Sequence, residues 1–285
     1  MHCVSIIGCG YTGIRLARCL RTSGHTVRGS GSRAASLEDI AATGSESVLL
    51  NLDSEGPGLD LGGNVVYYMV PPAPRGERDD RLERFLRRAT GHPRRVVYLS
   101  TTGVYGDRGG AAVDEETQPA PVSERAVRRL AAENTLRGWA DSRAVSWCIL
   151  RVPGIYGPGR LPLQRLMRRE PAIDPTDAGP GNRIQVEDLV TACIAAGFST
   201  RANGRLYNVT DGSSDSFTSF LLRVARIGDL PPPPLISRTA AAKSFPPLAW
   251  SFLSESRRVD NRRMLDELGV KLAFTDLDAG IRASL

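Results

Sequence analysis

Residues 8–13 read Gly8-Cys9-Gly10-Tyr11-Thr12-Gly13, and this short stretch decides the fold of the chain. The apolar run over residues 3–7 precedes it and predicts a short buried strand. An amphipathic helix is expected over residues 14–20, followed by a second strand over residues 25–28. A strand, a glycine turn, a helix and a second strand in this order are the context that the dinucleotide-binding fingerprint G-x-G-x-x-G requires.

Each glycine of this motif has a physical role in holding a nucleotide. Gly8 permits a tight turn, Gly10 lets the backbone approach a pyrophosphate, and Gly13 lets the helix pack closely on the strand. The free N–H groups and the positive dipole end at the helix N-terminus attract phosphates. We therefore predict that a dinucleotide cofactor binds this turn, through Gly8, Cys9, Gly10, Tyr11, Thr12 and Gly13.

The end of the second predicted strand distinguishes between the two nicotinamide cofactors. An NAD site normally places Asp or Glu there, where the carboxylate holds the ribose 2′-hydroxyl. In this chain the first acidic residue is Glu38, and residues 28–33 are Arg28-Gly29-Ser30-Gly31-Ser32-Arg33. Small and basic side chains suit a 2′-phosphate. We therefore predict NADP in preference to NAD, with contacts from Ser30, Ser32 and Arg33.

Composition argues against several classes of protein and site. No apolar run approaches the roughly 20 residues that a membrane span needs, and the N-terminus lacks a signal core, so we expect a cytoplasmic protein without membrane association. The five cysteines have no C-x-x-C spacing, which argues against a disulfide framework and a zinc site. The three histidines fall at predicted strand entries, so no metal site is expected.

The net charge of +6 raises the question of nucleic-acid binding. The arginines, however, are spread over predicted helix faces, such as residues 75–88 and 125–137, and alternate there with Glu and Asp. No aromatic platform accompanies them. We therefore expect a small-molecule substrate rather than a nucleic acid.

Strand-like and helical patterns alternate through the first half of the chain. Further apolar runs occur at residues 48–50, 64–70, 95–100 and 145–151. Near-continuous apolar strands between helices predict a parallel sheet that is covered on both faces. We predict an α/β doubly wound sheet, the Rossmann fold, over residues 1–158, with its sheet completed by residues 183–212. Residues 159–182 and 213–285 are expected to form a smaller, discontinuous C-terminal lobe that binds the substrate in a cleft between the lobes.

Four later motifs, taken with the glycine turn, resemble those of the extended short-chain dehydrogenase/reductases. They follow the patterns S-[ST]-x-x-V-Y-G, L-R-x-x-x-x-Y-G-P-G-R, I-H-V-D-D-L and Y-N-V-x-D, at Ser100–Asp107, Leu150–Arg160, Asn182–Leu189 and Tyr207–Asp211. The resemblance implies the NAD(P)-dependent epimerase/dehydratase family. It further implies an oxidoreductase or epimerase-like enzyme that acts on a small carbonyl, hydroxyl or sugar-like compound.

The resemblance also implies functional residues. Thr101 matches the family's catalytic Ser/Thr, and Tyr105 is the nearest phenol that could replace a missing proton donor. Arg160 and Arg183 flank the expected cleft and are candidates for binding an anionic substrate. The remaining expected cofactor contacts are Asn51, Leu52, Val70, Pro71, Pro72, Arg129 and Pro153.

One departure from the family pattern puts catalysis in doubt. The family carries Y-x-x-x-K on a helix, but aligned on Glu133 the two positions are Arg125 and Arg129. Arginine effectively never deprotonates, so it cannot replace the tyrosine as an acid or base. The chain thus resembles an atypical branch of the superfamily. Two hypotheses remain open: an enzyme with another proton donor, and an NADP-binding redox or nucleotide sensor without turnover.

Oligomeric state is a further expectation from the resemblance. Family members often pair through helices that correspond to residues 75–89 and 123–136, which implies a possible homodimer. Both segments are heavily charged here, and facing arginines would oppose such pairing.

Overall fold

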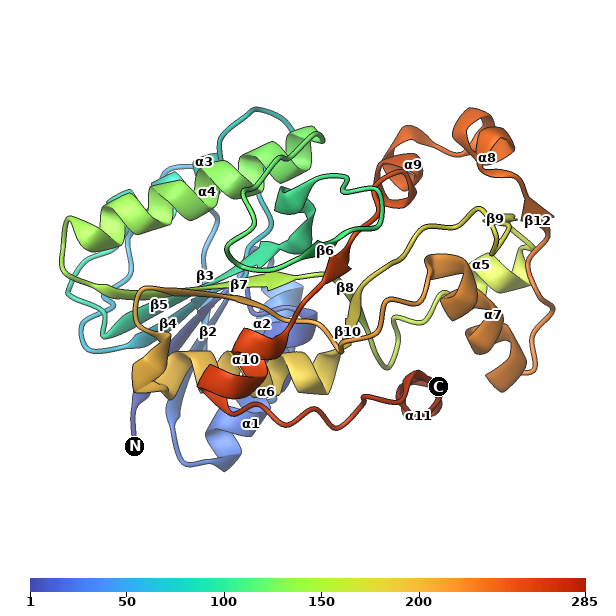
Figure 1. Ribbon diagram of the computed structural model, residues 1–285. Coiled ribbons are helices and arrows are strands. Elements are labelled where there is room, and N and C mark those ends of the chain that lie inside the picture. The colour runs from blue at the N-terminus through green and yellow to red at the C-terminus, as the bar shows by residue number, and fades with distance from the viewer.

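A seven-stranded parallel sheet forms the centre of the larger lobe in the computed structural model, which describes residues 1–285 (Figure 1). The strand order is β11-β7-β5-β4-β1-β2-β3. These strands are β1 (Cys3–Ile7), β2 (Thr26–Gly31), β3 (Glu46–Leu49), β4 (Val65–Tyr68), β5 (Arg95–Thr101), β7 (Ser146–Val152) and β11 (Arg205–Asn208). The order reverses between β1 and β4, and ligands of such sheets bind outside the carboxyl ends of the strands at this point. The predicted doubly wound α/β fold is confirmed.

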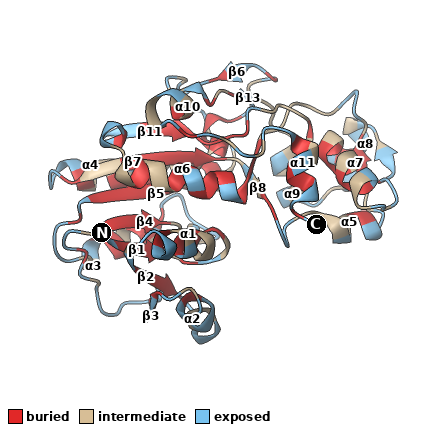
Figure 2. Ribbon diagram, turned by 90° about the horizontal axis from the view of Figure 1, so that it is seen from below, coloured by how far each residue is buried: buried red, intermediate tan, exposed pale blue.

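Helices cover both faces of the sheet, as Figure 2 shows by the buried strands between them. One face packs against α1 (Tyr11–Thr22), α2 (Ala34–Ala41), α6 (Val186–Phe198) and α10 (Arg262–Leu268). The other face packs against α3 (Asp80–Arg88) and α4 (Glu124–Asp141). Successive residues of a strand point to opposite faces, so Ile6 lies in the first core and Ile7 in the second.

The smaller lobe has a hydrophobic core of its own, which includes Tyr156, Phe220 and Leu221. Its strands are β8 (Gly154–Tyr156) paired with β10 (Arg183–Gln185), and β9 (Ala172–Ile173) paired with β12 (Leu235–Ile236). Its helices are α5 (Leu163–Met167), α7 (Phe217–Ile227), α8 (Arg238–Ser244), α9 (Pro247–Leu253) and α11 (Leu277–Arg282).

The C-terminal segment passes between the lobes. After α9, β13 (Arg258–Val259) pairs with β6 (Ala112–Val113), and Met264 of α10 is buried in the core of the larger lobe. The larger lobe also contains two short 3₁₀ helices, η1 (Thr102–Tyr105) after β5 and η2 (Thr200–Ala202) after α6. None of the helices has the length and apolarity that a membrane crossing requires.

A buried ion pair ties α4 to the sheet. The Glu133 carboxylate is inaccessible to solvent and accepts hydrogen bonds from Ser100 Oγ at 2.5 Å and from Arg151 Nη2 at 2.8 Å. Arg151 Nε also donates to Glu133, at 3.1 Å. Both charges depend on one another, because a buried charge without its partner keeps its full desolvation cost.

Glu133→Ala is expected to lower the free energy of unfolding by about 3–5 kcal/mol, since it leaves the Arg151 guanidinium buried and unpaired. Urea denaturation followed by circular dichroism measures the change. Glu124→Ala is the matched control on the same helix, because its side chain is 83% exposed, and it should cost about 1 kcal/mol or less. Equal losses of unfolding free energy in the two variants would contradict a stabilising role for the buried Glu133–Arg151 pair.

Candidate active site

The glycine turn joins β1 to α1 and lines a cavity of about 380 Å³. Gly10 begins α1 as its N-cap residue, and a Cβ placed on it would meet no atom within 4 Å. Gly8 has a φ of +81°, and Gly13 packs on the strand so closely that a Cβ would lie 3.2 Å from Ile6 Cγ2. The three glycines therefore have the tight turn, the open approach and the close packing expected of a phosphate-binding turn.

The other members of the turn differ in what they present to the cavity. Tyr11 and Thr12 line it, and the Tyr11 hydroxyl donates to the Pro158 carbonyl at 3.1 Å. The Cys9 side chain is buried, and burial raises the pKa of its thiol to about 12. Cys9 thus offers a ligand its backbone rather than its sulfur.

Of the three expected 2′-phosphate contacts, Ser30 lies within β2, and Ser32 and Arg33 follow this strand. Ser30 is buried, and its Oγ accepts the Gly8 N–H at 3.1 Å while its carbonyl accepts the Cys9 N–H at 2.8 Å. Ser30 therefore shapes the glycine turn, a role that the sequence prediction of a 2′-phosphate contact missed. Ser32 and Arg33 are exposed, and the Arg33 guanidinium forms no ion pair.

Several expected cofactor contacts lie outside the cavity at the glycine turn. Leu52 is buried, and Asn51 Oδ1 accepts the Asp53 N–H at 2.8 Å within its own loop. Val70 packs beneath Gly8, where a Cβ would come within 2.8 Å of its Cγ2. Pro72 also lies outside this cavity, whereas its neighbour Pro71 lines it.

A second cavity, of about 550 Å³, lies between the lobes and adjoins the first. Four residues line both cavities: Thr101, Pro153, Ile155 and Arg160. Thr101 ends β5 and caps η1, where its Oγ1 accepts the Gly103 N–H at 3.2 Å. Since this oxygen already accepts a hydrogen bond from the protein, its own proton is free to be donated to a ligand oxygen.

The larger cavity is lined by basic side chains. Its charged residues are Arg125, Arg160, Arg165, Arg183, Arg257 and Glu255. Five guanidinium groups against one carboxylate give it a positive potential that favours anions.

The two arginines that replace the family's Tyr and Lys point into different cavities. Arg129 lines the smaller cavity, and its Nη1 donates to the Tyr98 hydroxyl at 3.0 Å and the Leu99 carbonyl at 3.1 Å. Arg125 lines the larger cavity, half-buried, with its guanidinium carbon 3.7 Å from the centre of the Phe252 ring. Burial lowers the pKa of Arg125.

The structure corrects the prediction that Tyr105 donates a proton to the substrate. Tyr105 is fully buried and lines neither cavity. Its hydroxyl donates to Asn208 Oδ1 at 2.8 Å, and the guanidinium carbon of Arg151 lies 4.7 Å from the centre of its ring. Its hydroxyl therefore has no path to a ligand in the cleft, and burial raises the pKa of the phenol.

Arg160 and Arg183 both line the larger cavity, but they differ in burial and in their contacts. Arg160 is exposed and stacks 4.2 Å from the centre of the Tyr11 ring. Arg183 is buried and ties β10 to the start of α7, with Nη2 donating to the Asp215 carbonyl at 2.6 Å and the Ser216 carbonyl at 3.2 Å. The buried Nη1 of Arg183 has no hydrogen-bond partner.

Glu255 is the candidate residue that the sequence patterns missed. It follows α9 and is the single carboxylic acid that lines either cavity. Arg257 Nη1 donates to it at 2.9 Å and also donates to the Gly106 carbonyl, just beyond η1. No motif marks Glu255, because only the return of the C-terminal segment brings it to the cleft.

Comparison with known proteins places this site in a family. The model of the NAD dependent epimerase/dehydratase family matches residues 80–210. The chain belongs to this family. Protein YeeZ of Escherichia coli (strain K12) is similar to it, with 27% identity over 288 residues that cover 97% of each sequence.

Solved structures share the fold over nearly the whole chain. A functionally unknown conserved protein from Silicibacter pomeroyi DSS is 30% identical, with a TM-score of 0.81 and coverage of 99% of this chain and 98% of that one. The UDP-glucuronic acid 4-epimerase from Bacillus cereus, solved in complex with NAD, is 15% identical. Its TM-score is 0.75, with coverage of 99% and 97%.

Proposed function

We propose that this chain is an NAD(P)-dependent oxidoreductase that exchanges a hydride with a small carbonyl or hydroxyl compound carrying an anionic group. The observation that carries the proposal is the position of Thr101, where the glycine-turn cavity meets the arginine-lined cavity. A cofactor in the first cavity and a substrate in the second both come to this hydroxyl.

The glycine turn fits a nicotinamide dinucleotide. Gly10 leaves open space at the N-terminus of α1, where backbone N–H groups and the helix dipole favour a pyrophosphate. The binding of NAD by the Bacillus cereus epimerase supports the same class of ligand here. Gly8, Gly10, Tyr11, Thr12 and Gly13 would hold the cofactor, whose nicotinamide supplies or accepts the hydride.

Thr101 and Glu255 are the side chains that would serve the reacting oxygen. Thr101 donates a hydrogen bond to the substrate carbonyl and so orients it. Reduction of that carbonyl adds a hydride to carbon and a proton to oxygen. Arg125 cannot give up a proton, so Glu255, a carboxylate paired with Arg257 at rest, takes up a proton from solvent and passes it to the oxygen.

NADP(H) is expected to bind about ten-fold or more tightly than NAD(H), because Arg33 is free to pair with a 2′-phosphate and no carboxylate ends β2. Calorimetric titration with both cofactors measures the preference. Arg33→Ala should remove it, whereas Arg18→Ala, at an exposed position of α1, should retain it. Equal or tighter binding of NAD by the unaltered protein would refute the prediction.

Oxidation of NADPH in the presence of aldehydes, ketones, 2-oxo acids and nucleotide sugars tests the activity itself. Turnover of any of these compounds supports an oxidoreductase. The alternative is a redox or nucleotide sensor that binds NADP without turnover, which the replacement of the family's Tyr and Lys by Arg125 and Arg129 favours. Tight cofactor binding with no turnover of the whole panel would favour the sensor.

A further inference from the structure

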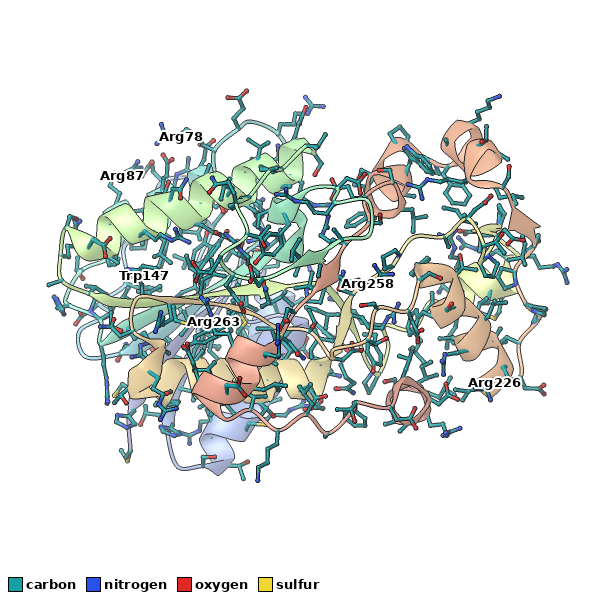
Figure 3. All side chains as sticks on the ribbon, viewed as in Figure 1. Arg78, Arg87, Trp147, Arg226, Arg258 and Arg263 are labelled. Carbon is teal, nitrogen blue, oxygen red and sulfur yellow. The ribbon has the colours of Figure 1, made fainter.

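Arg125 is a half-buried arginine of the larger cavity that forms no ion pair. Exposed arginines such as Arg78 and Arg87, both labelled in Figure 3, pair with acids: Arg78 with Glu83 at 2.7 Å and Arg87 with Glu55 at 2.5 Å. Arg125 has neither an ion pair nor a hydrogen bond from its guanidinium, although it is half-buried. A partly desolvated guanidinium without a partner is available to an anionic ligand.

The guanidinium of Arg125 is held in place from two sides. Its backbone lies in the first turn of α4, which Ser123 caps by accepting the Ala126 N–H. Its planar group stacks 3.7 Å from the centre of the Phe252 ring of α9. A guanidinium that lies over a ring face leaves the N–H groups at its edge free, and that edge can bind a carboxylate through two hydrogen bonds.

Gly103 lies between Thr101 and the start of α4, which carries Arg125. Gly103 lines the same cavity, and a Cβ on it would lie 3.4 Å from Thr101 Oγ1 and 3.9 Å from the Cβ of Ala126, the neighbour of Arg125. A ligand oxygen at Thr101 and an anionic group at Arg125 would therefore lie in the same cavity, within reach of one small molecule.

We propose that Arg125 binds a carboxylate attached to the reacting carbon, so that the substrate class is a 2-oxo acid and its product a 2-hydroxy acid. This inference rests on the proposed oxidoreductase function. The planar guanidinium of Arg125 matches the geometry of a carboxylate. Glu255 is the one acidic residue around the cavity, so a ligand must supply most of the negative charge that balances the arginines. In the reduction, C2 of the acid gains the hydride, its oxygen at Thr101 gains a proton from Glu255, and the carboxylate stays bound to Arg125.

Oxamate, a non-reacting mimic of a 2-oxo acid, tests the inference without turnover. It is titrated calorimetrically into the full-length protein saturated with NADPH, and cofactor binding is measured separately for each variant. Oxamate should bind the unaltered protein, whereas neutral propionamide should not. Arg125→Gln should weaken oxamate binding about ten-fold or more, since it removes a charged, two-point contact. Arg168→Gln removes an exposed arginine outside the cavity and should leave oxamate affinity unchanged.

The outcomes separate this inference from the function on which it rests. A failure of the unaltered protein to bind either nicotinamide cofactor would overturn the proposed function and the inference with it. Normal cofactor binding with no oxamate binding, or with equal oxamate affinity in Arg125→Gln, would overturn the inference alone. Tighter binding of inorganic phosphate than of oxamate at Arg125 would also overturn the assignment of a 2-oxo acid.

Discussion

A Gly10→Val variant is expected to fold normally and to lose measurable cofactor binding. The space around Gly10 is open, so an added side chain clashes with no atom, and its φ of −97° and ψ of −142° require only a local shift of the turn toward the extended region. The same space forms part of the cavity at the N-terminus of α1, where a branched side chain would exclude a pyrophosphate. Calorimetric titration with NADP and NAD measures the loss, and circular dichroism verifies the fold.

Gly138→Val is the matched control for this experiment. Gly138 is an exposed glycine of α4 whose added Cβ would also meet no atom within 4 Å, but it lines neither cavity. Cofactor affinity should therefore remain unchanged in this control. A folded Gly10→Val protein with normal cofactor affinity would show that the nucleotide binds elsewhere.

The fold could be predicted from local sequence because its signals are local. The strands at residues 95–100 and 3–7 are each defined by a few consecutive residues, and the structure has them as β5 and β1. Short edge strands were placed less accurately: residues 48–50 were expected where β3 spans Glu46–Leu49. An edge strand buries little apolar surface, so its pattern is weaker.

The candidate site was only partly predictable because it depends on long-range contacts. Thr101 lies at a strand end within a motif, and its position in the cleft follows from the fold. Tyr105 lies four residues later in the same motif, but its environment depends on Asn208, a partner from β11. Glu255 reaches the cleft only because β13 pairs with β6. Neither the burial of Tyr105 nor the exposure of Glu255 to the cavity is encoded in neighbouring residues.

Once a turnover assay exists, Glu255→Gln is expected to lower kcat about 10²–10⁴-fold, because the amide has no proton of suitable acidity to deliver. The amide still accepts the hydrogen bond from Arg257, so substrate and cofactor affinities should change little. Glu83→Gln, which removes an acid paired on the outer surface, should keep full activity.

Chemical rescue distinguishes proton transfer from a supporting role of Glu255. In Glu255→Ala the cavity loses its one carboxyl group, and added formate should restore part of the lost turnover by supplying another. If Glu255 only positioned Arg257, the rescued rate would not depend on the acidity of the added carboxylic acid, whereas proton transfer makes the rate follow that acidity across formate, acetate and propionate. Unchanged kcat in Glu255→Gln, with cofactor and oxamate bound normally, would show that the proton comes from solvent and would leave Thr101 as the only protein group at the reacting oxygen.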